Sequence, residues 1–140
     1  MPANTILMPM LALMLLTLAV WILLYVRRIA YMKANRIDAQ RVSTPEKAAE
    51  LIPEHVQNPA YNFKNLFELP VLFYGLCLYL YVTGSADAVY VIAGWAFVGL
   101  RAVHSLIQCT TNVVMHRFVI YMAGAAALWF MLLRAVLQAI

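Results

Sequence analysis

Four long apolar stretches dominate the pattern of this chain, and polar segments separate them. The stretches cover about residues 5–26, 62–83, 89–110 and 117–139. About 20 apolar residues in a helix are enough to cross the hydrocarbon of a bilayer, at roughly 1.5 Å per residue. The pattern therefore predicts four transmembrane helices.

The connections between these stretches differ in length. Only a few residues join the second stretch to the third and the third to the fourth, whereas residues 27–61 form one long loop. Short connections place successive helices antiparallel to one another. Hydrophobic residues make up 65% of the chain and charged residues 11%, whereas soluble domains carry about 25% charged residues. We predict an all-α fold, a four-helix integral membrane bundle of up-down-up-down topology, with residues 1–140 as a single domain.

Basic residues gather between the first two apolar stretches, and both termini lack them. Such an excess marks cytoplasmic loops, so we expect both termini to face away from the cytoplasm. Acidic residues are mixed into the same loop, which favours a solvated segment over a lipid-binding tract. The membrane topology also accounts for the net positive charge without a nucleic-acid partner. The basic residues are Arg27, Arg28, Lys33, Arg36, Arg41, Lys47 and Lys64.

One short helix is expected inside the long loop. Ser43-Thr44-Pro45-Glu46 has the spacing of a capping box, with a proline in the first turn. The pattern predicts a surface helix that continues to about Leu51 and stops before Pro53.

Ionisable residues within the apolar stretches are the first candidates for function. Glu68, Arg101, His104 and Arg117 lie inside them or at their edge. A charged side chain near the centre of a bilayer costs about 2.5–3.5 kcal/mol on insertion scales, so such residues face a bundle interior, a partner or a ligand.

Helical spacing groups the polar residues of the last three stretches onto three faces. Residues three or four apart lie on one side of a helix, and all three faces fall in the cytoplasmic half of the predicted bundle. At these depths Glu68 and Arg101 are expected to pair. The faces are Tyr61-Asn65-Glu68, Arg101-His104-Gln108 and Arg117-Tyr121.

A purely structural interpretation of these faces stays open. A buried polar network of Glu68 and Arg101, with their neighbours, would fix the register of the helices. Arg134, near the far end of the last stretch, is expected to extend toward the opposite headgroups in a structural role. Cys77 and Cys109 have no metal-ligand spacing and are expected to be free, buried thiols. No metal site is predicted.

The pattern resembles one known family. Asn65-Leu66-Phe67-Glu68-Leu69-Pro70 opens the second stretch, Arg101-Ala102-Val103-His104 lies late in the third, and Arg117 opens the fourth. Together with four spans and a basic loop after the first, these segments resemble the MAPEG superfamily, the membrane-associated proteins in eicosanoid and glutathione metabolism. The chain is most similar in pattern to a bacterial-type member of that superfamily. The resemblance covers nearly the whole chain and implies a protein of the bacterial inner membrane.

The resemblance also implies an assembly, a cosubstrate and residue roles. The assembly is a homotrimer surrounded by membrane lipids, with glutathione between subunits and a lipophilic electrophile arriving from the lipid. Arg117 matches the arginine that stabilises the thiolate. An arginine at the end of the first helix also reaches glutathione, and Arg27 and Arg28 both remain candidates. The residues that resemble the rest of the glutathione site are Asn65, Glu68, Arg101, His104, Gln108 and Tyr121.

Two positions depart from the family pattern. Tyr61 stands where glutathione-using members carry an arginine for a carboxylate, and a neutral phenol does not replace a bidentate ion pair. Gln108 stands where eicosanoid-metabolising members often carry tyrosine, which argues against prostaglandin or leukotriene synthesis. Three functions remain open: a glutathione transferase or peroxidase, a non-catalytic lipid or hydrophobic small-molecule binding protein, and a subunit of a larger membrane complex.

Overall fold

The computed structural model describes residues 2–140, and all regular structure within this range is helical. Five long helices form the body of the molecule, and three short ones lie at its N-terminus and in the long loop. The long helices are α1 (Leu7–Ala34), α3 (Glu54–Asn65), α4 (Leu69–Val82), α5 (Ala88–Cys109) and α6 (Val114–Ala139). The short ones are η1 (Ala3–Ile6), η2 (Ala39–Val42) and α2 (Pro45–Leu51).

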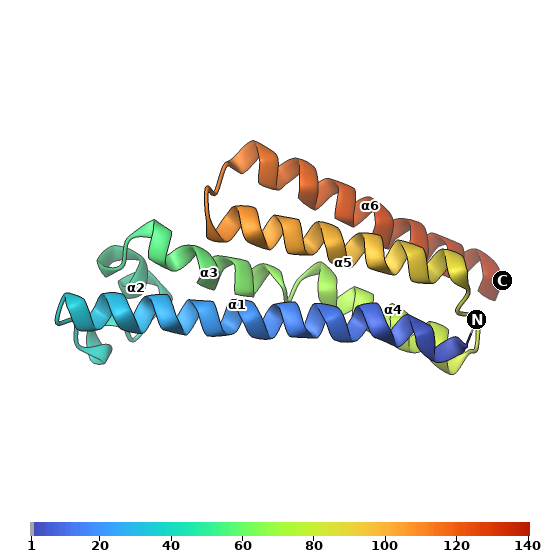
Figure 1. The fold of residues 1–140 in the computed structure, drawn as a ribbon, viewed down its shortest axis with the longest axis horizontal. Coiled ribbons are helices and arrows are strands. Elements are labelled where there is room, and N and C mark those ends of the chain that lie inside the picture. The colour runs from blue at the N-terminus through green and yellow to red at the C-terminus, as the bar shows by residue number, and fades with distance from the viewer. Residues whose placement is uncertain (1) are drawn as a thin grey trace.

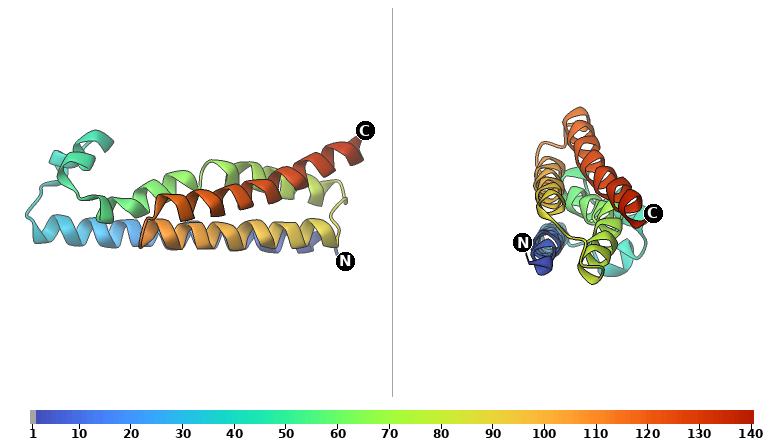
Figure 2. Two further views of the ribbon diagram at one scale, coloured as in Figure 1. Left: turned by 90° about the horizontal axis from the view of Figure 1, so that it is seen from above. Right: turned by 90° about the vertical axis from the view of Figure 1, so that its right-hand side faces the viewer.

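The long helices lie side by side along one axis, and the N- and C-termini lie at the same end (Figure 1). α1 runs the whole length of the molecule, α3 and α4 return along it, and α5 and α6 form an antiparallel pair that contacts α1 and α3. The last turns of α1, together with η2 and α2, extend beyond the α5–α6 turn (Figures 1 and 2). This projecting end carries Lys33, Arg36, Arg41 and Lys47.

Four segments are long and apolar enough to cross a membrane, so the protein is an integral, multi-pass membrane protein. Large apolar side chains cover their outer faces, as a lipid environment requires. The core joins α1, α4, α5 and α6, and the rings of Phe73 and Phe97 pack at its centre, with centroids 4.8 Å apart. The segments are Asn4–Ala34, Glu54–Val82, Ala88–Cys109 and Val114–Ala139.

α1 continues as a helix beyond Val26, where we placed the end of the first span. It reaches Ala34, because the basic and apolar residues that follow Val26 are compatible with a helix even though they need not lie in the membrane. Arg36, with φ of 53°, then turns the chain away in the left-handed conformation that often follows a helix. Arg27 and Arg28 therefore project from a rigid helix.

The second membrane segment is also longer than the apolar pattern suggested, and it is broken. α3 begins at Glu54, well before residue 62, and the helix is interrupted between Asn65 and Leu69. Pro70 explains the break, because its ring lacks an N–H and clashes with the carbonyl four residues earlier in a continuous helix. Glu68 lies in the break, with φ of −98° and ψ of −106°.

The short helix expected in the loop is present as α2. Thr44 caps it, and its hydroxyl accepts a hydrogen bond from the backbone N–H of Lys47 at 3.3 Å. A small apolar cluster holds α2 and the start of α3 against the last turns of α1. The buried members of that cluster are Ala48, Ile52 and Val56.

Candidate functional site

A hollow of about 190 Å³ lies where α3, α5 and α6 meet. Four of the polar residues singled out in the sequence line it, one from α3, one from α5 and two from α6. They are Asn65, His104, Arg117 and Tyr121, with Val114 and Phe118 as apolar neighbours. The fold therefore brings together polar faces from three helices.

Arg101 lies beside this hollow in an unusual state for a buried arginine. Its side chain is 1% exposed, and one Nη donates to the backbone carbonyl of Asn65 at 2.9 Å. Its guanidinium also lies over the ring of Tyr121, 5.5 Å from the centroid. Nε and the other Nη have no hydrogen-bond partner in the described structure. A buried donor without a partner costs about 1–3 kcal/mol, and more when it is charged, so the site favours an acceptor from a ligand.

His104 lies one helical turn from Arg101 and is 2% exposed. Its Nδ1 likewise has no partner within residues 2–140, and its ring lies 5.9 Å from that of Tyr121. The two residues thus place three unpartnered polar atoms in one buried region.

Arg117 lies in the first turn of α6 and is half-buried. One Nη donates to Oδ1 of Asn112 at 2.7 Å. Its cationic group therefore approaches the hollow from the end where α5 turns into α6.

Asn65 ends α3, and its position at the helix break explains the hydrogen bonds around it. The last carbonyls of a helix lack intrahelical partners, and cations are favoured there. Arg101 meets this need at the backbone of Asn65. The Asn65 side-chain amide donates to Oε1 of Gln108 at 3.1 Å, so Gln108 supports Asn65 from α5.

The predicted pair between Glu68 and Arg101 is not formed, and that prediction was wrong. The one ion pair in residues 2–140 joins Asp87 to Arg134. The helix break before Pro70 takes Glu68 out of the helical register of Asn65. The spacing of three residues therefore no longer places the side chains of Asn65 and Glu68 on the same face, the one that contacts Arg101. Glu68 is exposed on the single chain, and Arg101 bonds a backbone carbonyl instead.

A family model supports the resemblance that these residues carry. The model of the MAPEG family matches residues 6–137, nearly the whole chain. The chain belongs to the MAPEG family. Comparison with curated proteins and with solved structures gave no match.

The MAPEG family includes glutathione transferases and peroxidases besides other members, so membership alone does not assign a reaction. The candidate site therefore rests on its geometry. Of the predicted site residues, Asn65, His104, Arg117 and Tyr121 line the hollow, and Arg101 lies beside it.

Neither arginine at the predicted end of the first span lines the hollow between α3, α5 and α6. Arg27 donates to the carbonyl of Cys109, at the end of α5, at 2.8 Å, and to that of His55 at 3.3 Å. The second carbonyl is free because Pro59, four residues later, has no N–H to donate. Arg28 donates to Oε1 of Gln57 at 2.8 Å. Both arginines tie α1 to the neighbouring helices in the single chain.

Sequence reasoning missed the residue that holds Arg117. Asn112 follows the end of α5 and has φ of 50°, a conformation that asparagine tolerates better than most residues. An asparagine two or three residues after a predicted helix end is a usable signal for such a turn, but its partners on α3 depend on the packing of α3 against α5.

A second polar cluster closes the opposite end of the bundle. The two carboxylate oxygens of Asp87 accept from Arg134 at 2.8 and 2.6 Å, and Arg134 also lies over the ring of Tyr90, 4.3 Å from its centroid. Asp87 additionally caps α5 by accepting from the N–H of Tyr90, whose hydroxyl donates to Gln138 at 2.6 Å. Arg134 thus joins α6 to the start of α5 through Asp87 and Tyr90, and its predicted extension toward the headgroups stays a prediction.

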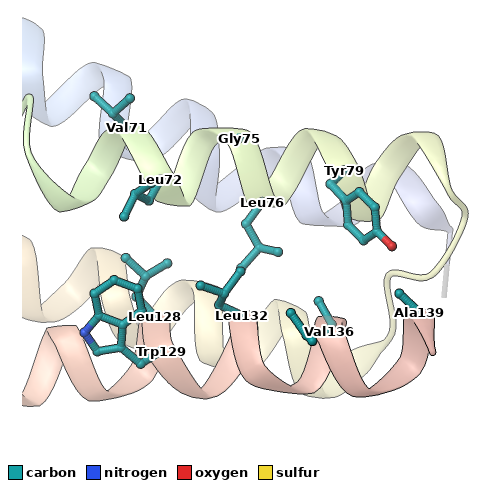
Figure 3. A pocket seen from close by; sticks show the side chains of 11 residues that line it. Val71, Leu72, Gly75, Leu76, Tyr79, Leu128, Trp129, Leu132, Val136 and Ala139 are labelled. Carbon is teal, nitrogen blue, oxygen red and sulfur yellow. The ribbon is translucent and has the colours of Figure 1, made fainter.

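An apolar groove of about 480 Å³ runs between α4 and α6, whose contact is less extensive than that of α5 with α6 (Figure 3). Leu72 and Leu76 from α4 face Leu128 and Leu132 from α6 across it. The Tyr79 hydroxyl and the indole nitrogen of Trp129 are the polar groups drawn among these side chains. In a membrane protein such a groove opens to apolar molecules.

Proposed function

We propose that this protein is a membrane-bound glutathione-dependent transferase or peroxidase that acts on lipophilic electrophiles. The observation that carries the proposal is the buried set of unpartnered polar atoms on Arg101 and His104 beside the hollow. Glutathione is a water-soluble tripeptide with two carboxylates, an amino group and a thiol. A carboxylate suits the two free donors of Arg101, because charge-assisted hydrogen bonds to a guanidinium are short and strong.

Arg117 is the residue proposed to act on the reacting sulfur. A free thiol has a pKa of about 8.5, and a fixed cation beside it lowers that pKa and increases the thiolate fraction at neutral pH. The thiolate is the species that attacks an electrophile. A guanidinium stays protonated at neutral pH, so Arg117 acts as an electrostatic stabiliser and not as a base.

Glu68 supports assembly into a homotrimer with the site between subunits. Its carboxylate is exposed on the single chain, in the middle of the membrane segment Glu54–Val82. An exposed charge facing lipid is costly, so a polar surface is expected to cover it. A neighbouring subunit and the amino group of glutathione would together satisfy Glu68.

The remaining parts of the proposal concern membrane placement. The projecting end of α1 and α2 carries the basic loop. We therefore place this end on the cytoplasmic side of a bacterial inner membrane, with both termini on the opposite side. The hollow then lies within reach of cytoplasmic glutathione, and the lipophilic electrophile arrives through the bilayer.

The apolar groove between α4 and α6 favours a second candidate, a non-catalytic lipid or hydrophobic small-molecule binding protein. Tyr61 in place of the arginine of glutathione-using relatives points the same way. This candidate predicts a lipid or quinone that co-purifies with the protein and no affinity for glutathione. Mass spectrometry of the gently solubilised protein tests it.

The deciding experiment is glutathione binding to the purified protein in detergent, followed by the ultraviolet absorbance of the bound thiolate as a function of pH. We expect saturable binding in the wild type, and loss of the thiolate signal at neutral pH in Arg117→Ala with binding retained. Arg41→Ala, a change in the exposed loop, is the matched control and should behave as the wild type. Absence of binding at millimolar glutathione would reject the proposed function. An undiminished thiolate signal in Arg117→Ala would reject the proposed role of Arg117.

A further inference from the structure

Asn112 lies at the centre of the turn between α5 and α6. Its backbone N–H donates to the carbonyl of Ile107 at 2.7 Å and so satisfies the end of α5. Its φ of 50° turns the chain toward Val113, the N-cap of α6. The backbone alone thus explains why asparagine or glycine is suitable here.

The side chain of Asn112 has contacts that the turn does not require. Its Oδ1 accepts from Nη1 of Arg117 at 2.7 Å, the short distance of a charge-assisted hydrogen bond. Its Nδ2 donates to Oε1 of Glu54 at 3.1 Å and to Oδ1 of Asn58 at 3.3 Å. One neutral amide therefore lies between the guanidinium on α6 and a carboxylate on α3.

These contacts separate two charges that attract each other. Glu54 and Asn112 line a polar hollow of about 400 Å³ at the start of α3, and Arg117 lines the hollow of the candidate site. A guanidinium that paired directly with Glu54 would have its positive charge offset by the carboxylate, and its effect on a nearby sulfur would weaken. An amide carbonyl holds the guanidinium in place without a negative charge in direct contact with it.

We propose that Asn112 is a positioning residue, which holds the guanidinium of Arg117 at the candidate site and keeps it from pairing with Glu54. The inference rests on the proposed function, because the reacting group is the thiol of bound glutathione. It adds a residue that acts through Arg117 without contact with substrate. It also links Arg117 to α3, the helix that carries Asn65.

Asn112→Gly is the direct test, because glycine adopts positive φ without strain and the substitution removes all three side-chain hydrogen bonds. We expect the pKa of the thiol of bound glutathione to rise toward the value of a free thiol, about 8.5, because Arg117 is then free to pair with Glu54. Adding Glu54→Gln should restore much of the low thiol pKa, because the competing carboxylate is gone. Thiolate absorbance across pH, with the glutathione Kd measured for each variant, reads both effects.

The matched control is Thr111→Gly, a glycine substitution at the exposed neighbouring position of the same turn. It should leave the thiol pKa unchanged. A purely turn-forming role for Asn112 predicts no rescue by Glu54→Gln, so failure of that rescue would overturn the inference. An equal pKa rise in Thr111→Gly would overturn it as well.

A second variant guards against misfolding of Asn112→Gly. Asn112→Asp keeps an acceptor for Arg117 but places a charge on it, so the thiol pKa should rise while the glutathione Kd changes little. An unchanged thiol pKa in a folded Asn112→Asp protein would count against the proposed reason for a neutral amide.

A measurement without glutathione separates this inference from the proposed function. Phenylglyoxal modifies accessible arginines, and peptide mass spectrometry reports the rate at each one. In a Glu54→Gln background, Asn112→Gly should increase modification of Arg117 by about tenfold or more, because one charge-assisted hydrogen bond is lost, while exposed Arg41 stays constant as the reference. An unchanged rate at Arg117 would overturn the contact itself, and absence of glutathione binding in the wild type would overturn the proposed function alone.

Discussion

The two ends of the bundle carry polar clusters of opposite character. At the end where the termini lie, Arg134 has the carboxylate of Asp87 and the ring of Tyr90 as partners, and the cluster is closed. Around the hollow, Arg101 has two donors without partners among residues 2–140, although it is more deeply buried than Arg134. Both clusters place an arginine beside a tyrosine, so residue type alone does not separate them.

The difference shows what distinguishes a structural arginine from a binding one in a membrane protein. A closed cluster satisfies its own charges and stabilises the contact between helices, whereas an open cluster carries a cost that a ligand can remove. A ligand that binds the folded state alone also raises its stability. We therefore expect the closed cluster to respond in stability and the open cluster in ligand binding.

Arg101→Met should have the largest effect and should separate the two clusters most clearly. Replacement of a buried charge by an apolar side chain of similar size is often neutral or stabilising, so the Tm without glutathione should not fall. Glutathione affinity should fall by about 10- to 100-fold, because charge-assisted hydrogen bonds are worth about 1.5–3 kcal/mol. Equilibrium binding and thermal unfolding in the same detergent measure both.

The reciprocal change, Arg134→Met, provides the control for Arg101→Met. It should lower the Tm and leave glutathione affinity unchanged. Loss of glutathione affinity in both variants, at equal Tm, would mean that the comparison between the clusters is wrong.

Asp87→Ala should destabilise the closed cluster by a smaller amount. It removes the cap of α5, which typically costs about 1 kcal/mol, together with the ion pair to Arg134. Asp87→Asn retains a capping side chain and removes only the charge, so its Tm should lie between those of the alanine variant and the wild type. An alanine variant as stable as the wild type would show that the cluster contributes nothing measurable.

Of these changes, acid should have the smallest effect on stability. Of the two clusters, the closed one is expected to respond to it. Hydrogen bonds from Arg134 lower the pKa of Asp87 to about 2, from an ordinary value of 3.8. Because the unfolded chain binds this proton more readily, the stabilisation is present above about pH 4 and is lost as the pH falls toward 2. The Asp87 side chain is 44% exposed, so solvent screening keeps the effect modest.

The Tm of the wild type in detergent, relative to that of Asp87→Asn, measures this dependence. The difference between the two proteins should shrink between about pH 4 and pH 2. A difference that stays constant over this range would mean that another group carries the acid sensitivity.

Several features were predictable because they depend on local chemistry. Apolar length identified four segments able to cross a membrane, and the Thr44-Pro45 pattern identified α2. The family resemblance was confirmed over residues 6–137. The role of Asn65, His104, Arg117 and Tyr121 in glutathione binding stays a proposal, although the fold brings all of them to one hollow.

Pro70 shows why the pairing partners were harder to predict. It was visible in the sequence, but the length of the break and the new direction of Glu68 were not. Helical spacing therefore failed at this point, and Arg101 found a backbone carbonyl that no side-chain pattern reveals.

Hydrophobic length, loop charge and short motifs are local properties, so they were enough to assign the chain to the helical membrane proteins and to the MAPEG family. Which arginine donors are satisfied depends instead on the packing of the helices: Arg134 bonds Asp87, Arg117 bonds Asn112, and Arg101 bonds the backbone of Asn65 with one of its donors. Each of these contacts joins residues on different elements or across a turn. Their geometry depends on how the helices pack and where they break, which periodicity along one helix does not specify.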